Sequence, residues 1–282
     1  MPIEKPLPLM VGNKAYYSLT SYDPVEITVE VPYTSDEDIQ YGLQMTVADM
    51  GGSPENLDDP AWLAEHFDGM TSKEQVYEAM RQQMVAMGAQ IAEQQKVSKC
   101  IDALSTRLCQ SIPPQHLEDA RQMVRMSFTQ QLQDEGMTPE QFVMRSGTTM
   151  PQLEAMFDRQ ARHMAEGDAA LSAYAHEKKL KVDEHEFGRL LGIPAEQVDE
   201  VIQRTRAVGQ YDEMREAALR SKAAQIVVAE CSCNYVHETP EQARARMAQY
   251  RQMEQKYSQR FDDADEGDGA KTNEGGTGFK LV

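Results

Sequence analysis

Apolar and polar residues alternate in two segments near the start of the chain. The segment Val25-Glu26-Ile27-Thr28-Val29-Glu30-Val31 keeps this two-residue period and is rich in β-branched side chains, which is typical of a half-buried β-strand. Leu43-Gln44-Met45-Thr46-Val47 alternates in the same way. We therefore favour a β-hairpin that turns across residues 32–40.

A helix is the alternative for the second of these segments. Four apolar residues would share one face of that helix: Ile39, Leu43, Val47 and Met50. Thr34 and Glu37 could form a capping box at its start.

The following segments carry the three- to four-residue apolar spacing of helices. One helix is predicted from Ser72 towards Gln110, with an interrupted apolar seam made of Met80, Met84, Met87, Ile91, Ile101 and Leu108. The run Ser111-Ile112-Pro113-Pro114 ends it, because a residue before proline avoids helical geometry. A second helix is predicted over residues 115–135. Its core stripe consists of Leu117, Ala120, Val124, Phe128 and Leu132.

Two corners between helices repeat one pattern, in residues 68–76 and 135–143, and a shorter form occurs in residues 147–153. Each corner joins a glycine to a threonine and, three residues later, to a glutamate or glutamine. Glycine adopts the left-handed turn that closes a helix, and the threonine with its partner forms the capping box that opens the next one. The chain is therefore predicted to contain helical arms joined by tight corners.

These patterns predict a mainly α fold of multi-helix arms with a small N-terminal β element. A polar helix with few apolar positions is predicted after Thr239-Pro240, and the Gly- and Asp-rich end should be disordered. We predict four regions: an N-terminal extension with the short hairpin (1–52), a helical domain (53–236), the polar helix (237–261) and a disordered acidic tail (262–282).

The net charge of the chain limits the classes of partner that we expect. The formal net charge is −18, from 46 acidic and 28 basic residues, and such a field repels phosphate backbones and anionic lipid. We expect no direct nucleic-acid partner and no membrane partner. No basic block and no run of about 18 apolar residues occurs, so we expect neither a signal peptide nor a transmembrane helix, and a cytoplasmic protein.

Methionine is frequent, with 18 copies, whereas aromatic residues make up only 7% of the chain. A flexible thioether adapts to irregular neighbours, so methionine both fills gaps in cores and serves promiscuous binding surfaces.

The four cysteines are too few for a disulfide framework, so free thiols in a reducing compartment are expected. Cys231, Cys233 and His237 could offer three metal ligands, but a zinc site needs a fourth ligand and normally a second close pair. We therefore expect neither a metal nor a cofactor.

No motif indicates catalysis. Paired carboxylates such as Asp58/Asp59 and Glu184/Glu186 stand at predicted helix starts, where capping is their expected role. The histidines lack the metalloprotease spacing, and neither a nucleophile elbow nor a phosphate loop after a strand occurs. We expect that the protein is not an enzyme.

Taken in order, six of these signals resemble the C-terminal domain of trigger factor, the bacterial chaperone family that shelters nascent chains. The resemblance covers residues 57–236, about two-thirds of the chain. Its parts are Leu57-Asp58-Asp59, Ile112-Pro113-Pro114, Gly136 to Phe142, Gly147 to Leu153, Val182-Asp183-Glu184-His185-Glu186, and Lys222-Ala223-Ala224.

The resemblance implies an ATP-independent chaperone, or holdase, that binds unfolded or nascent polypeptides. Two features of the family are missing. Its Gly-Phe-Arg-x-Gly-Lys ribosome loop has no counterpart beyond Gly12-Asn13-Lys14, so docking on the ribosome by that route is not expected. The residues before the helical arms are also too few for the FK506-binding-type prolyl isomerase domain, so isomerase activity should be absent.

A Met-lined cleft between the arms is the predicted client-binding site. Its expected lining is Met123, Met126, Met137, Met144, Met150, Met156 and Phe157. Ordinary packing between helices is the alternative for each of them. For the protein as a whole, the alternatives are a helical adaptor that binds one folded partner through residues 241–261 and the tail, and an exported chaperone with an upstream signal sequence.

Overall fold

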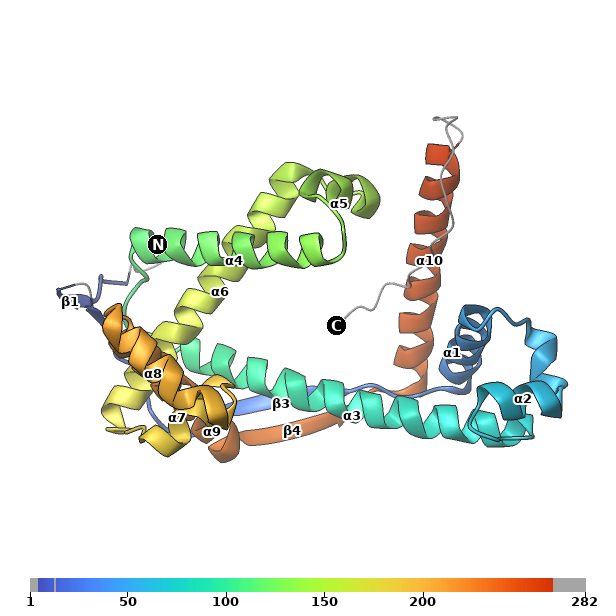
Figure 1. The fold of residues 1–282 in the computed structure, drawn as a ribbon, viewed down its shortest axis with the longest axis horizontal. Coiled ribbons are helices and arrows are strands. Elements are labelled where there is room, and N and C mark those ends of the chain that lie inside the picture. The colour runs from blue at the N-terminus through green and yellow to red at the C-terminus, as the bar shows by residue number, and fades with distance from the viewer. Residues whose placement is uncertain (1–4, 13, 266–282) are drawn as a thin grey trace. The chain divides into compact units, whose positions relative to one another are not determined.

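The computed structural model describes residues 5–12 and 14–265 of the chain. This part is mainly helical, as predicted, and contains ten α-helices (Figure 1). It divides into two compact units. The first consists of Met1–Val29 and Ala92–Val236, and the second of Glu30–Ile91 and His237–Val282.

The long helix α3 (Lys73–Ser105) gives residues to both units. The other helices of the first unit follow one another along the chain: α4 (Pro114–Asp134), α5 (Pro139–Ser146), α6 (Met150–Glu177), α7 (Glu184–Leu191), α8 (Val198–Ala207) and α9 (Tyr211–Glu230). A short 3₁₀ turn at Ala195–Gln197 precedes α8. Within this unit α6 packs against both α4 and α9, and α7 packs against α9.

The predicted corners around α5 are confirmed. Thr138 forms a capping box with Gln141 at the start of α5, and Thr149 forms one with Gln152 at the start of α6. The glycine before each box is left-handed, with φ of 67° at Gly136 and 64° at Gly147. A side chain there would clash with its own backbone, so glycine allows the chain to reverse within a few residues.

The corner before α3 uses the residue next to the predicted one. The Ser72 hydroxyl accepts a hydrogen bond from the Gln75 amide at 3.3 Å, and the Gln75 side chain accepts one from the Ser72 amide at 3.2 Å. Thr71 with Glu74 also fits the capping pattern, and the spacing alone does not distinguish the two pairs.

The predicted strand at residues 25–31 is confirmed as β3 (Glu26–Val31), in which buried and exposed residues alternate. Its partner is β4 (Ser232–His237), which the sequence pattern did not reveal. The Ser232 amide donates to the Val25 carbonyl and the Glu238 amide donates to the Val31 carbonyl, both at 2.9 Å. The two strands therefore run parallel.

A second small sheet lies nearer the N-terminus, in residues expected to be irregular. The strands β1 (Leu9–Val11) and β2 (Lys14–Tyr16) pair in antiparallel fashion. The chain thus has a small N-terminal β element, at a different place from the predicted one.

The predicted strand at residues 43–47, and with it the hairpin across residues 32–40, is wrong. These residues belong to α1 (Asp36–Asp49), the helical alternative. Its capping box joins Ser35 to Asp38, one residue further along than the predicted pair on both sides. Ile39, Leu43 and Val47 recur every four residues and are all buried, because the helical period rather than the strand period places them on one face.

The core of the second unit forms around that face of α1. Its other main elements are a 3₁₀ turn (Pro54–Asp58), the helix α2 (Pro60–His66) and the first turns of α3. Leu43 and Val47 pack there with Leu57, Leu63 and Val76.

The predicted polar helix is confirmed as α10 (Pro240–Asp265). It extends four residues beyond the predicted boundary at Phe261. The predicted disordered tail lies, from residue 266 onward, outside the described residues.

Candidate functional site

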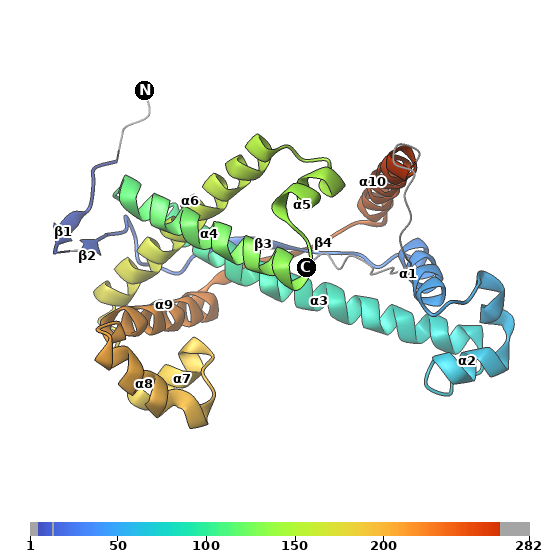
Figure 2. The ribbon, with the colours of Figure 1, turned by 45° about the horizontal axis from the view of Figure 1, so that its top comes forward.

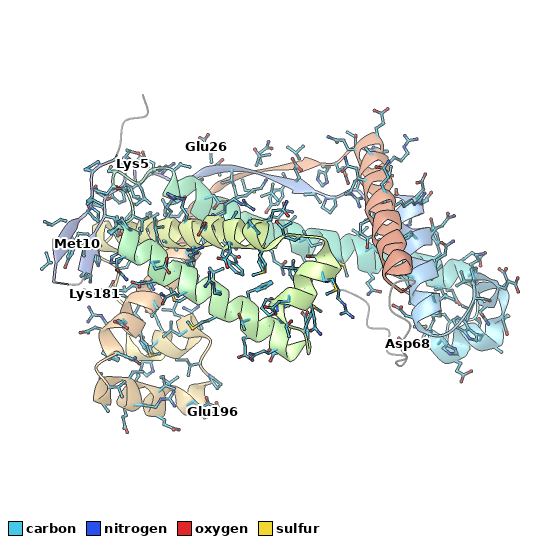
Figure 3. All side chains as sticks on the ribbon, turned by 90° about the horizontal axis from the view of Figure 1, so that it is seen from above. Lys5, Met10, Glu26, Asp68, Lys181 and Glu196 are labelled. Atoms are coloured by element: carbon cyan, nitrogen blue, oxygen red, sulfur yellow. The ribbon has the colours of Figure 1, made fainter. Side chains whose placement is uncertain are left out.

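The helices α4 and α6 form the framework that presents most of the predicted site residues. They cross each other in Figure 2 and share a core made of Ala120, Val124, Leu153, Phe157 and Ala161. Small residues at Ala120 and Ala161 allow the two backbones to approach closely. The side chains between the two helices can be followed in Figure 3.

Three aromatic rings attach the short helix α5 to this framework. The Phe128 ring packs edge-on against Phe142 of α5, at 5.1 Å between centroids, and against Phe157 of α6 at 5.2 Å. Such edge-to-face pairs add specificity of geometry to ordinary apolar burial. The position of α5 is therefore set by the same cluster that joins α4 to α6.

Charged groups complete the contact between α4 and α6. Arg121 and Arg125 of α4 both pair with the Glu154 carboxylate of α6, at 2.9 and 2.6 Å. Arg121 Nε also lies 2.9 Å from Asp158 Oδ1 as an ion pair, without the alignment of a hydrogen bond. The Arg125 guanidinium covers one face of the Phe157 ring at 5.9 Å. Because these groups are partly exposed, they contribute more to register than to stability.

The predicted client-binding residues divide by exposure. Four methionines are exposed on three successive helices: Met123, Met126, Met144 and Met150. We call these four residues the methionine surface. Met137 and Met156 are half-buried, and Met156 packs against the core of α4 and α6.

Phe157 occupies a different position from the one predicted. It is only 3% exposed and forms part of the core between α4 and α6. Leu153 and Phe157 are four residues apart on the buried face of α6, so the helical period places Phe157 inside. Its ring supports the methionine surface from within the core but is not part of that surface.

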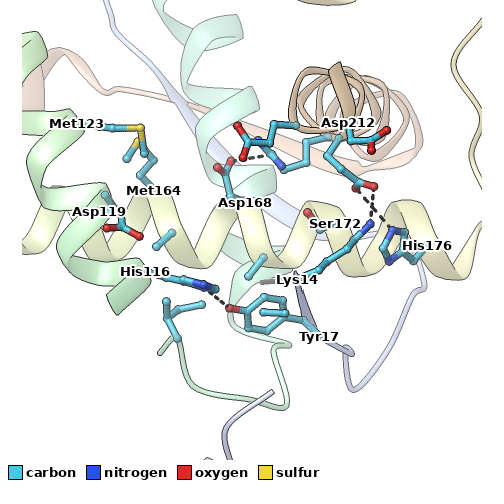
Figure 4. Close-up of a pocket in the computed structure, with 18 of the residues that line it drawn as sticks. Lys14, Tyr17, His116, Asp119, Met123, Met164, Asp168, Ser172, His176 and Asp212 are labelled. Carbon is cyan, nitrogen blue, oxygen red and sulfur yellow. Dashed lines mark hydrogen bonds and ion pairs between the residues drawn. The ribbon is translucent and has the colours of Figure 1, made fainter. Parts of the chain in front are cut away.

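A pocket of about 880 Å³ opens beside the methionine surface, within the first unit (Figure 4). Met123 of α4 and Met164 of α6 form an apolar part of its wall. Side chains from α4, α6, α9 and the β1–β2 region complete it, including Tyr17, His116, Ser172 and His176.

Acidic and basic groups from separate elements meet in this pocket. The Lys14 ammonium lies 2.6 Å from the Glu216 carboxylate, and His176 Nε2 lies 3.6 Å from the same carboxylate. Arg220 Nε lies 3.5 Å from Asp168 Oδ1. Acidic residues outnumber Lys and Arg in the lining. The acidic residues are Asp119, Asp168, Asp212, Glu213 and Glu216, and the basic ones are Lys14, Arg215 and Arg220.

Two groups in the pocket have raised pKa values. Burial raises the pKa of Asp168, and the charge on Arg220 opposes that shift. Burial also raises the pKa of Tyr17, whose hydroxyl lies 3.5 Å from His116 Nδ1. A partly desolvated cavity of this composition suits an amphipathic side chain, with an apolar stem and a cationic end.

The sequence pattern did not reveal this pocket. Its lining is drawn from segments between Val11 and Arg220, so no local spacing marks it. Met123 was predicted as a site residue, whereas Met164 was not.

No group of three or more His, Cys, Asp or Glu side chains is placed to hold a metal ion among residues 5–12 and 14–265. Over the same residues, no helix has both the length and the apolar character that crossing a bilayer requires.

Comparison with known proteins gives one family. The family described as bacterial trigger factor protein (TF) C-terminus matches residues 72–229. No curated protein sequence matches the chain. Among solved structures, a hypothetical Mycoplasma protein is similar, with 10% sequence identity over 80% of this chain and 93% of that chain, at a TM-score of 0.38.

Proposed function

We propose, since the chain belongs to the bacterial trigger factor C-terminal family, that it is an ATP-independent chaperone that holds unfolded or nascent polypeptides. The matched span, residues 72–229, lies within residues 57–236, where the order of sequence signals resembles that family. Membership supports a chaperone-like domain in general terms. The exposed methionine surface on α4, α5 and the start of α6 is the observation that carries the more specific proposal.

The methionine surface has the properties that a binding site for varied apolar segments requires. Met126 is 64% exposed and Met144 is 80% exposed, so their thioethers are free to pack against a ligand. Unbranched side chains can adapt to many shapes, whereas rigid aromatic anchors select one. The framework below them is held by buried apolar and aromatic contacts, so only the surface side chains have to rearrange.

The adjoining pocket supports a role in holding clients that carry basic residues. Met123 belongs both to the methionine surface and to the pocket wall, which makes the two continuous. A client segment lying across Met123 can insert a Lys or Arg side chain towards the acidic lining. The net charge of −18 would keep such a complex soluble.

The proposal includes no enzymatic step. We propose that the chain lacks prolyl isomerase activity and acts without nucleotide, and that it works in the cytoplasm. The adaptor alternative is not favoured, because the first turns of α10 are already engaged within the second unit. Ala243 and Met247 are buried there, and Arg246 pairs with Asp38 at 3.4 Å.

The test measures light scattering from a chemically denatured, aggregation-prone enzyme diluted into excess chaperone. We expect wild type to suppress aggregation, and Met126→Glu with Met144→Glu to weaken client binding about a hundredfold, since each loses roughly 1.5 kcal/mol of apolar contact. The control is Met45→Glu on α1 with Met87→Glu on α3, which also replaces two exposed methionines and adds the same charge.

Wild type that leaves aggregation unchanged at excess would contradict the proposed function. Equal loss in the control would contradict the assignment to the methionine surface.

A further inference from the structure

Three of the four cysteines gather beside α3 in the first unit. Cys100 on α3 is 0% exposed, whereas Cys231, at the end of α9, and Cys233, in β4, are half-buried. All are free thiols. The Cys100 and Cys231 side chains are hydrogen-bonded to each other. Cys231 Sγ also donates to the Val228 carbonyl at 3.2 Å, so the Cys100 thiol is the donor and the two sulfur atoms face each other.

A second contact, between β4 and α3, fixes how the strand is positioned along the helix. The Tyr235 hydroxyl donates to the Glu93 carboxylate at 2.6 Å. Cys100 follows Glu93 by two turns on the same face of α3, a displacement of about 10 Å. Cys233 and Cys231 precede Tyr235 on one face of the chain, and Cys231 lies about 13 Å back from it. Because β4 runs opposite to α3 (Figure 1), the two displacements match and place Cys231 beside Cys100.

We propose that Cys100 and Cys231 are a site of reversible oxidation, at which a peroxide converts the two thiols into an intramolecular disulfide. The Cys231 sulfur attacks one oxygen of hydrogen peroxide, the O–O bond breaks, and a sulfenic acid and water are formed. The Cys100 sulfur then attacks the Cys231 sulfur and displaces the hydroxyl group as a second water molecule. Two thiols are oxidised, and one peroxide is reduced to two waters.

The environment sets the order of these steps. Cys231 is half-buried and can meet a dissolved oxidant first, whereas Cys100 has no exposed surface. Burial, with the hydrogen bond to Cys231, raises the pKa of Cys100 to about 12, and the nearby charge of Lys96 opposes this shift. Thiolate is the attacking form, so the closing step should be slow at neutral pH and the sulfenic acid at Cys231 should persist long enough to be trapped.

The test treats the full chain with hydrogen peroxide, digests it with trypsin without reduction and identifies linked peptides by mass spectrometry. We expect the peptide of residues 100–107 to be joined to that of residues 223–244 and to be lighter by two hydrogen atoms than the sum of the two. Free thiols should fall from four to two, and dithiothreitol should restore them. Dimedone, which traps sulfenic acids, should label Cys231 and prevent the link.

Single cysteine substitutions identify which of the neighbouring thiols form the link. The link should persist in Cys233→Ser and in Cys109→Ser and should disappear in Cys231→Ser. Fragment ions of the wild-type linked peptide give the same assignment without any substitution. A link that survives Cys231→Ser, a bond between Cys231 and Cys233, or oxidation confined to Cys109 would overturn the proposal.

Discussion

Asp168 is a carboxylate whose surroundings disfavour its charge. It lies on α6 in the wall of the pocket, where Arg220 is its ion-pair partner at 3.5 Å. Burial raises its pKa more than the charge on Arg220 lowers it. The folded chain therefore binds a proton at Asp168 more tightly than the unfolded chain does.

The sign of the pH dependence follows from this shift. The stability that the protonated form contributes is fully present below the ordinary pKa of an aspartate, about 4, and is lost as pH rises through the folded pKa. Asp168→Asn keeps a neutral side chain at all pH values. We expect its melting temperature to rise relative to wild type as the pH increases from about 4 towards 7.

A matched variant tests the role of the neighbour. Arg220→Gln removes the charge that opposes the shift, so thermal melts of this variant should show a steeper loss of stability with pH than wild type. Identical profiles for all three proteins would show that burial of Asp168 does not affect its proton.

Among the buried residues of the core that α4 and α6 share, Phe157 has the largest side chain. Phe157 contacts the Phe128 ring and lies under the Arg125 guanidinium, with almost no exposed surface. The small residues of the same core, Ala120 and Ala161, cannot fill the space that it occupies. This explains why an aromatic residue stands at this position of the stripe.

Phe157→Ala is expected to lower the free energy of unfolding by about 3–4 kcal/mol, from lost burial and an unfilled cavity. Met126→Ala, on the exposed side of α4, should change it by less than about 0.5 kcal/mol. Urea denaturation followed by circular dichroism measures both. Equal effects would mean that Phe157 is not part of the core.

The elements that the sequence predicts well are those whose signals are local. The capping boxes at Thr138 and Thr149 depend on residues three apart, and their corners occur where expected. The segment at residues 43–47 misled because five residues fit both periods, and only burial against α2 and α3 decides between them. The strand β4 was missed for a different reason, since its pairing with β3 involves residues far apart in the chain.

The sequence likewise predicts part of the candidate site and misses the rest. Exposed positions such as Met126 lie off the apolar stripe of their helix, so the helical period identifies them. Phe157 fitted the stripe of α6, and an aromatic residue on a stripe is more often core than ligand surface. The pocket requires α4, α6 and α9 to meet, and no pattern within one helix contains that information.

The net charge of −18 acts on every client that approaches the chain. Long-range attraction should favour unfolded polypeptides with a net positive charge, and salt should weaken it because the screening length is only about 8 Å at physiological ionic strength. Apolar contacts with the methionine surface should respond little to salt.

We expect a denatured client of net positive charge to bind more tightly than an acidic client of similar hydrophobicity at low salt, and the difference to shrink by about tenfold between 50 mM and 500 mM NaCl. Fluorescence anisotropy of two labelled, unfolded peptides with matched apolar content measures this. Acidic clients that bind as well as basic ones at low salt would contradict a role for the charge.

The parallel pair of β3 and β4 has a consequence for how the chain is made. The two strands are separated by roughly 200 residues, and a ribosome adds about 5–20 residues per second. The first strand therefore leaves the exit tunnel some tens of seconds before its partner exists, with the Val25 and Val31 carbonyls that β4 and its flank will pair still unpaired. During its own synthesis this polypeptide passes through the condition of the clients that we propose it protects.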